Sequence, residues 1–198
     1  MSTHTDETGK KLGMWLFLYT EIILFGGLFV LYAVYFAVYT EDFIAGGAQL
    51  NRLFGFVNTV ILLISSFAVA ASITAVQQHQ KKIALWSLAA TLVCGLIFLI
   101  NKYFEWGHKF EVGIYPNSPM LQEGPPGQNM FFGLYYVVTG LHGLHIIIGM
   151  TLLAVAMGFV AKDRVTATRF ALLENAGLYW HLVDLIWIFI FPLFYLVI

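Results

Sequence analysis

Charged residues are scarce in this sequence. Asp, Glu, Lys and Arg make up 11% of its 198 residues, whereas soluble domains carry about 25%. The formal net charge is -1, so the chain offers no basic surface that would predict a nucleic-acid partner. Apolar residues account for 60% of the chain instead. This composition is typical of a membrane protein rather than of a soluble enzyme or binding domain.

Cysteine is nearly absent. The single cysteine, Cys94, lies within an apolar run, which excludes an intrachain disulfide and any metal site with two or more thiolate ligands from this chain. The segment from Met1 to Lys11 lacks the apolar core and cleavage pattern of a signal peptide, and the apolar run after it is too long for one. We therefore expect that run to be retained as a membrane helix.

A helix that spans a membrane needs ~20 mainly apolar residues, and five runs meet this requirement. They are Leu12–Tyr39, Leu53–Val76, Ile83–Trp106, Phe131–Val160 and Leu172–Ile198. Alternating polar and apolar segments, the pattern of a membrane barrel, are absent from the sequence. We predict an all-α, polytopic membrane protein in which residues 1–198 form a single transmembrane domain of five helices. Between the helices, Thr40–Arg52 is expected to be a short loop and the proline-rich segment Gly107–Asn129 to be irregular.

The basic residues predict how the bundle is oriented. Cytoplasmic segments of membrane proteins carry an excess of Lys and Arg. Seven of the ten basic residues lie in the N-terminal segment and in the second and fourth connections: Lys10, Lys11, Lys81, Lys82, Lys162, Arg164 and Arg169. The other side has Arg52, Lys102 and Lys109. We therefore expect the N-terminus in the cytoplasm and the C-terminus outside.

Each predicted helix has one face of polar or small residues, since residues three, four and seven apart lie on the same side. These faces carry Glu21 in the first helix; Asn58, Ser65 and Ser72 in the second; Cys94, Asn101, Glu105 and His108 in the third; His142, His145 and Gly149 in the fourth; and Glu174, His181 and Asp184 in the fifth. Such faces predict a packed bundle rather than independent anchors.

The rise of 1.5 Å per residue predicts which polar residues share a level in the membrane. In a core ~30 Å thick, we expect Glu21, His145, His181 and Asp184 to meet in the middle or inner half. Glu105 is expected near the outer surface. Ionisable side chains at bilayer depth are costly and usually face the protein interior, so this cluster is the candidate functional site.

Three explanations of the cluster remain open on the residues alone. It is a hydrogen-bonded network that fixes helix packing, a proton-handling site with Glu21 as the titrating group, or a metal or haem site. The third has least support, because carboxylate-bridged di-metal bundles need Glu and Glu-x-x-His from each half, and this chain has one buried Glu in the cluster. The close spacing of His142 and His145 also cannot clamp a haem by itself.

Motifs in all five runs resemble subunit III of the haem-copper oxidases. The fourth and fifth runs contain TGLHGLHIIIG from Thr139 and YWHLVDLIWIF from Tyr179. The first three contain YTEIILFG from Tyr19, NTVILLISS from Asn58 and FEW from Phe104. The resemblance covers essentially everything after Lys10. Because two N-terminal helices of the larger members are missing, the chain is similar to the five-helix bacterial form.

The resemblance implies a subunit of a proton-pumping terminal oxidase in the bacterial cytoplasmic membrane. Such a subunit has no catalytic residues, cofactor ligands or metal ligands of its own; haem and copper are carried by the catalytic subunit I. It stabilises subunit I, holds phospholipids and supports proton uptake, beside other subunits such as II and IV and, in a further assembly, within a respiratory supercomplex. Glu21 corresponds to the family's buried carboxylate. The family's polar network corresponds to His142, His145, His181, Asp184, Glu105, Asn58 and Ser65.

Other functions remain as alternatives. Glutamate at position 21 is more typical of cytochrome c oxidases than of quinol oxidases, so a cytochrome c oxidase is the leading hypothesis. A quinol oxidase subunit or a nitric oxide reductase-associated relative would share the fold. From different functional classes, a stand-alone proton-conducting transporter would use Glu21 and the histidines as a relay, and a membrane di-metal enzyme would use them as ligands.

Overall fold

The computed structural model describes residues 3–197 and is predominantly helical. The helices are α1 (Thr3–Val38), α2 (Thr40–Ala48), α3 (Arg52–Gln77), α4 (Lys81–Glu111), α5 (Pro119–Gln122), α6 (Pro126–Ala161) and α7 (Ala171–Tyr195). Helices α1, α3, α4, α6 and α7 are long and apolar enough to cross a membrane, which confirms the predicted all-helical bundle. Residues 1, 2 and 198, which the predicted domain includes, lie outside the described residues.

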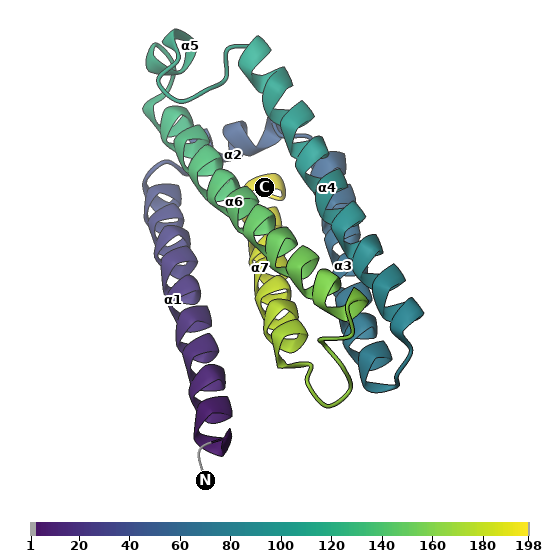
Figure 1. Ribbon diagram of the computed structural model, residues 1–198. Helices are drawn as coiled ribbons and strands as arrows, with labels where there is room; N and C mark the ends of the chain where they lie inside the picture. Colours follow the sequence, from purple (N-terminus) through teal and green to yellow (C-terminus); the bar gives the residue numbers. More distant parts are fainter. Residues whose placement is uncertain (1–2, 198) are drawn as a thin grey trace.

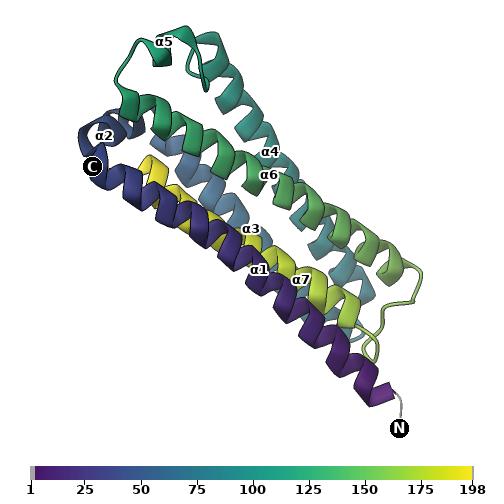
Figure 2. The same cartoon turned by 90° about the vertical axis from the view of Figure 1, so that its left-hand side faces the viewer.

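The long helices run up and down, so that their connections gather at two ends (Figures 1 and 2). The start of α1 lies at the same end as the α3–α4 and α6–α7 connections. The short helices α2 and α5 and the end of α7 lie at the opposite end. The segments that carry seven of the ten basic residues therefore share one end of the bundle, here called the basic end.

Helices α1, α4 and α6 are longer than the sequence predicts, and two predicted loops contain helices. Helix α1 begins at Thr3, α4 continues to Glu111, and α2 occupies most of the connection after α1. The prediction of a wholly irregular proline-rich connection was wrong, because α5 forms within it and α6 begins at Pro126. A proline fits the first turn of a helix, where its missing N–H would have no helical partner. At α5, the Ser118 hydroxyl also caps the helix by accepting from the backbone N–H of Leu121 (3.3 Å).

Trp180 on α7 is the point at which four helices meet. Its side chain is fully buried, and its Nε1 donates to the hydroxyl of Ser65 on α3 (3.0 Å). Its ring lies against two glycines: an added Cβ would come within 2.8 Å of the ring at Gly149 on α6 and within 3.0 Å at Gly95 on α4. Small residues of this kind let membrane helices approach closely. Helix α7 is accordingly the central helix, with 50% of its most apolar stretch buried.

Helix α1 is the peripheral helix of the bundle. Only 11% of its most apolar stretch is buried, and it packs against α6 and α7 through one face. That face carries the buried side chains of Phe25 and Tyr32, and the Tyr32 hydroxyl donates to the backbone carbonyl of Leu193 on α7. The remaining surface of α1 exposes large apolar side chains such as Trp15 and Val30, as suits contact with lipid or with another membrane helix.

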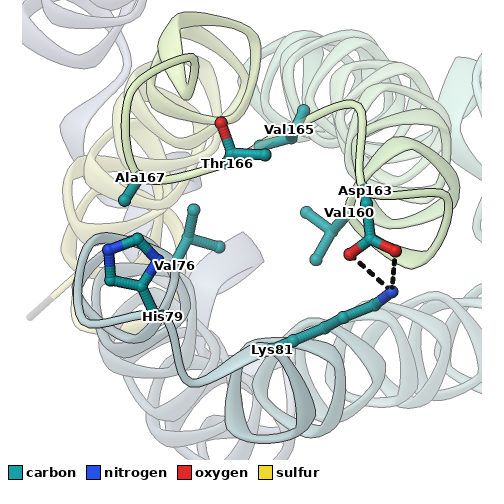
Figure 3. Close-up of a pocket in the computed structure, with 8 residues that line it drawn as sticks. All are labelled: Val76, His79, Lys81, Val160, Asp163, Val165, Thr166 and Ala167. Atoms are coloured by element: carbon teal, nitrogen blue, oxygen red, sulfur yellow. Dashed lines mark hydrogen bonds and ion pairs between the residues drawn. The ribbon is translucent and has the colours of Figure 1, made fainter.

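An ion pair joins the two connections at the basic end. Lys81 Nζ lies 2.7 Å from both carboxylate oxygens of Asp163, beside a small hollow of about 110 Å³ (Figure 3). Asp163 has a positive φ of 55°, a conformation that Asp tolerates better than most residues. Because both side chains are exposed to solvent (41% and 73%), we expect the pair to contribute less than ~1 kcal/mol to stability.

The glycine contacts predict opposite effects of two alanine substitutions on α6. Gly149→Ala should lower the thermal unfolding temperature, because the new methyl group overlaps the Trp180 ring and overpacking costs ~1–3 kcal/mol. At Gly143 an added Cβ meets nothing within 4 Å, so Gly143→Ala should be neutral or should stabilise the helix by up to ~1 kcal/mol. Circular dichroism of the purified chain in detergent measures both. Equal unfolding temperatures for the two variants would contradict the close contact at Gly149.

Candidate functional site

A hydrogen-bonded pair of ionisable side chains joins α1 to α6. Glu21 Oε2 lies 2.8 Å from His145 Nε2. The other ring nitrogen of His145, Nδ1, lies 2.7 Å from the backbone carbonyl of Leu141, one turn earlier on α6. Two of the four residues predicted to share a level in the membrane are therefore in direct contact, and they belong to the peripheral helix and to the core.

The geometry of the Glu21–His145 pair determines how many protons it holds. A carbonyl oxygen can only accept, so Nδ1 of His145 donates its proton to Leu141. The contact between Nε2 and Glu21 then needs one proton. Either a neutral Glu21 donates to a neutral ring, or a protonated ring donates to the carboxylate. The hydrogen bond is therefore compatible with two placements of one proton, on Glu21 or on the ring of His145.

Aromatic rings enclose this pair. The His145 ring lies 5.2 Å from the ring of Phe25 and 6.4 Å from the ring of Tyr179, measured between centroids. The Tyr179 hydroxyl also donates to the backbone carbonyl of His145 (3.4 Å). The side chains of Glu21 and His145 remain 13% and 9% exposed. The pair therefore lies at the boundary between α1 and the core, and it is not sealed within the bundle.

The other two residues of the predicted cluster face a different helix. His181 Nδ1 makes a 2.6 Å hydrogen bond with the hydroxyl of Ser66 on α3. Asp184 is buried, and both of its carboxylate oxygens lack a hydrogen-bond partner among the described residues. The cluster predicted at one level is thus two groups, one between α1 and α6 and one between α7 and α3.

His142, one turn before His145, lies in an aromatic environment. Its ring centroid is 5.5 Å from that of Phe98 on α4 and 5.2 Å from that of Trp187 on α7. The side chain is fully buried, and neither ring nitrogen has a hydrogen-bond partner in the part of the chain that the structure describes. His142 and His145 share a helix face, as predicted, but only His145 contacts a carboxylate.

A buried ion pair lies nearer the end of the bundle opposite the basic end. Lys102 Nζ on α4 lies 2.9 Å from Glu105 Oε2, from the Tyr135 hydroxyl on α6 and from the Tyr195 hydroxyl on α7. The Tyr195 hydroxyl also contacts both carboxylate oxygens of Glu105 (2.8 and 2.9 Å). All four side chains are buried. This Lys102 cluster satisfies the charge of each partner and joins three helices.

The buried face of α4 differs from the predicted one. It carries Thr91, Gly95, Phe98, Lys102, Glu105 and Lys109. His108, predicted on the same face as Glu105 and near the outer surface, is exposed and lines one hollow together with Glu105. Asn101 does make a predicted interhelix contact, because its amide donates to Asn58 Oδ1 on α3 (2.9 Å). Asn58, Ser65 and Ser72 are all buried along one face of α3.

Among the side chains that the structure describes, no three from His, Cys, Asp or Glu converge as metal ligands do. The Lys102 cluster was not predicted, because the distribution of Lys and Arg places Lys102 on the outer side of the membrane. A signal was available, because Lys102 lies three residues before Glu105 and the two side chains therefore share a helix face.

Removal of the Lys102 charge should destabilise the bundle strongly. Lys102→Met leaves Glu105 buried without its cation, and such a change typically costs ~3–5 kcal/mol. The double variant Lys102→Met, Glu105→Gln removes both charges and should recover much of that loss. Thermal unfolding in detergent measures the difference, with Lys81→Met as the exposed control. If the single variant were as stable as the control, the buried ion pair would be contradicted.

Comparisons with known proteins give the chain its family. The family model described as "Cytochrome c oxidase subunit III" matches residues 1–197. The chain is 32% identical to a cytochrome c oxidase subunit 3 of Synechocystis, over 98% of this chain and 78% of that protein. It is 28% identical to a cytochrome bo(3) ubiquinol oxidase subunit 3 of Buchnera aphidicola, over 98% of this chain and 91% of that protein.

A third relative combines two subunits in one polypeptide. The "Heme-copper oxidase subunit I+III" of Aeropyrum pernix is 30% identical over 93% of this chain, which corresponds to 22% of that protein. The match to the family model extends over almost the whole chain, and the relatives cover both cytochrome c and quinol oxidases. The chain belongs to the cytochrome c oxidase subunit III family, whose members are components of haem-copper oxidase complexes.

Proposed function

We propose that this chain is a non-catalytic subunit III of a proton-pumping haem-copper oxidase, and that the Glu21–His145 pair supports proton uptake by the complex. The observation that carries the proposal is the contact of His145 with Glu21 through Nε2 (2.8 Å) and with the Leu141 carbonyl through Nδ1 (2.7 Å), a geometry that needs one proton between the two side chains. In this role the chain has no redox centre of its own. The haems and copper belong to subunit I, and the chain stabilises that subunit and holds phospholipid beside it.

The proton chemistry follows from the two positions of the shared proton. When the pair holds its proton, its net charge is zero in either position. When the proton leaves, Glu21 remains as a carboxylate, and the unprotonated Nε2 of His145 cannot donate a hydrogen bond to it. Uptake of a proton restores this hydrogen bond and is therefore favoured. Phe25 and Tyr179 keep bulk water away from the ring, while the partial exposure at the α1 boundary leaves a route for exchange.

The proposed partner is subunit I of the oxidase. A relative named for subunits I and III as one chain supports a location of this chain beside subunit I. The exposed apolar surface of α1 suits a membrane partner. We further propose a bacterial cytoplasmic membrane location with the basic end in the cytoplasm, because that end carries most of the Lys and Arg residues.

A cytochrome c oxidase is the proposed type of complex. Both cytochrome c and quinol oxidase subunits are similar to this chain over nearly its whole length. Glutamate at position 21, which is typical of the cytochrome c type, supports the first. Purification of the complex from native membranes, followed by identification of the partner chains, distinguishes the two types and also tests for subunit II, subunit IV and a supercomplex.

Replacement of Glu21 by glutamine tests the proton role. In Glu21→Gln the new side-chain amide can still donate to His145 Nε2, so the complex should assemble, but the pair can no longer hold a mobile proton. We expect slower sustained turnover of the purified oxidase and a changed pH dependence. Asp163→Asn, which removes a carboxylate at an exposed site, should leave both unchanged.

Two outcomes would contradict the proton role. If Glu21→Gln prevented assembly with subunit I, the pair would have a structural role instead. If the chain alone conducted protons across liposome membranes, the stand-alone transporter would be the better description. Separately, a haem or copper absorption band in the chain purified without partners would contradict the absence of a redox centre.

A further inference from the structure

Helices α4 and α6 enclose an apolar groove on the surface of the bundle. Two adjoining hollows form it, of about 520 and 620 Å³, and both include Ala154 in their lining. From Lys82 to Leu99 the groove follows α4 for ~25 Å at 1.5 Å per residue. Its lining is mainly apolar, with Lys82 at one end and Thr151 as a polar residue further along.

Small residues keep the groove open. Ala89, Ala154 and Gly158 line it between larger side chains such as Trp86 and Met157. A Cβ added at Gly158 would meet nothing within 4 Å, so the space above this glycine is empty of protein. An apolar hollow of this length suits a hydrocarbon chain, because polar ligands would find few partners along it.

The basic end of the groove differs chemically from the rest. Lys82 is exposed and forms no ion pair with any side chain that the structure describes. Its neighbour Lys81 is instead held by Asp163 (Figure 3). One turn after Lys82, Trp86 is 78% exposed, and exposed indoles near helix ends lie at the level of lipid headgroups. A free ammonium group and an indole therefore mark the headgroup level at this end of the groove.

We propose that the α4–α6 groove binds a phospholipid with an anionic headgroup, whose phosphate pairs with Lys82 and whose acyl chain lies over Gly158 and Ala154. This inference deepens the lipid-holding part of the proposed function and rests on it. One leaflet is ~15 Å thick, half of a ~30 Å core. An acyl chain that starts at the level of Lys82 therefore reaches from the hollow beside Lys82 into the hollow that contains Thr151. The complementary charge favours an anionic lipid over a zwitterionic one.

A lipid explains the groove better than a partner helix does. A helix that filled the groove would cover the basic end and would have to supply a carboxylate for Lys82 at the membrane surface. An anionic phospholipid has a negative headgroup and an apolar chain in one molecule. These match the groove, which has Lys82 at the membrane surface and apolar residues below it. A partner helix is the competing outcome of the experiment.

The oxidase complex in nanodiscs of mixed phosphatidylglycerol and phosphatidylcholine tests the acyl-chain site. Native mass spectrometry of the released complex should show phosphatidylglycerol retained by the wild type. Gly158→Leu fills the groove and should abolish this retention. Gly143→Leu, on the same helix and also with open space at its Cβ, is the matched control and should retain the lipid. Equal retention by both variants, or a partner subunit cross-linked to the groove, would overturn the proposal.

Lys82→Gln tests the headgroup contact without changing the groove. It should lower the preference for phosphatidylglycerol over phosphatidylcholine about fivefold, the factor that corresponds to ~1 kcal/mol for one lysine near an anionic surface. Arg169→Gln removes an exposed charge at the same end of the bundle and should leave the preference unchanged. An unchanged preference in Lys82→Gln would overturn the headgroup assignment.

The same preparations separate this inference from the proposed function. Subunit I is identified in each purified complex before the lipid is measured. A chain that purifies without subunit I would contradict the proposed function. If the Gly158→Leu complex contained subunit I and still retained the lipid, the groove site would be contradicted and the proposed function would not.

Discussion

The packing of this bundle depends on the indole of Trp180. Burial of apolar surface gives little drive for association between helices that are already in lipid, so close contact and hydrogen bonds must supply it. Trp180 provides both, since its ring fits against Gly95 and Gly149 and its N–H donates to Ser65. Helices α3, α4 and α6 are thereby held around α7. Helix α1 makes no use of this contact, and its position depends on other interactions.

The Glu21–His145 hydrogen bond connects that peripheral helix to the core. It is one of the polar contacts that attach α1, together with the Tyr32 hydroxyl on the carbonyl of Leu193. The same bond therefore helps to fix α1 and is also the proposed site of proton exchange. A substitution that keeps the hydrogen bond but cannot exchange a proton separates the structural role from the proposed one.

The sequence predicts which residues lie at the same height along the bundle better than it predicts rotation about the helix axes. Hydropathy and rise per residue identify the five long helices and bring Glu21 to the level of His145. The direction in which a side chain points depends on the partner helix, so His181, which was predicted at the same level, contacts Ser66 instead. Lys102 was misjudged for a related reason. Its burial depends on Tyr135 and Tyr195, which are distant in sequence.

The hydrogen bonding of the clusters indicates where proton chemistry is possible. In the Lys102 cluster, the ammonium group has three acceptors at 2.9 Å and Glu105 has Lys102 and Tyr195 as partners, so loss or gain of a proton would break contacts without making new ones. His142 has no such partners among the residues described, and aromatic rings surround it. Among these three, only the Glu21–His145 hydrogen bond would persist with the proton on either partner. The Lys102 cluster therefore suits a structural role, and this contrast supports the proposal that places proton exchange at the boundary between α1 and α6.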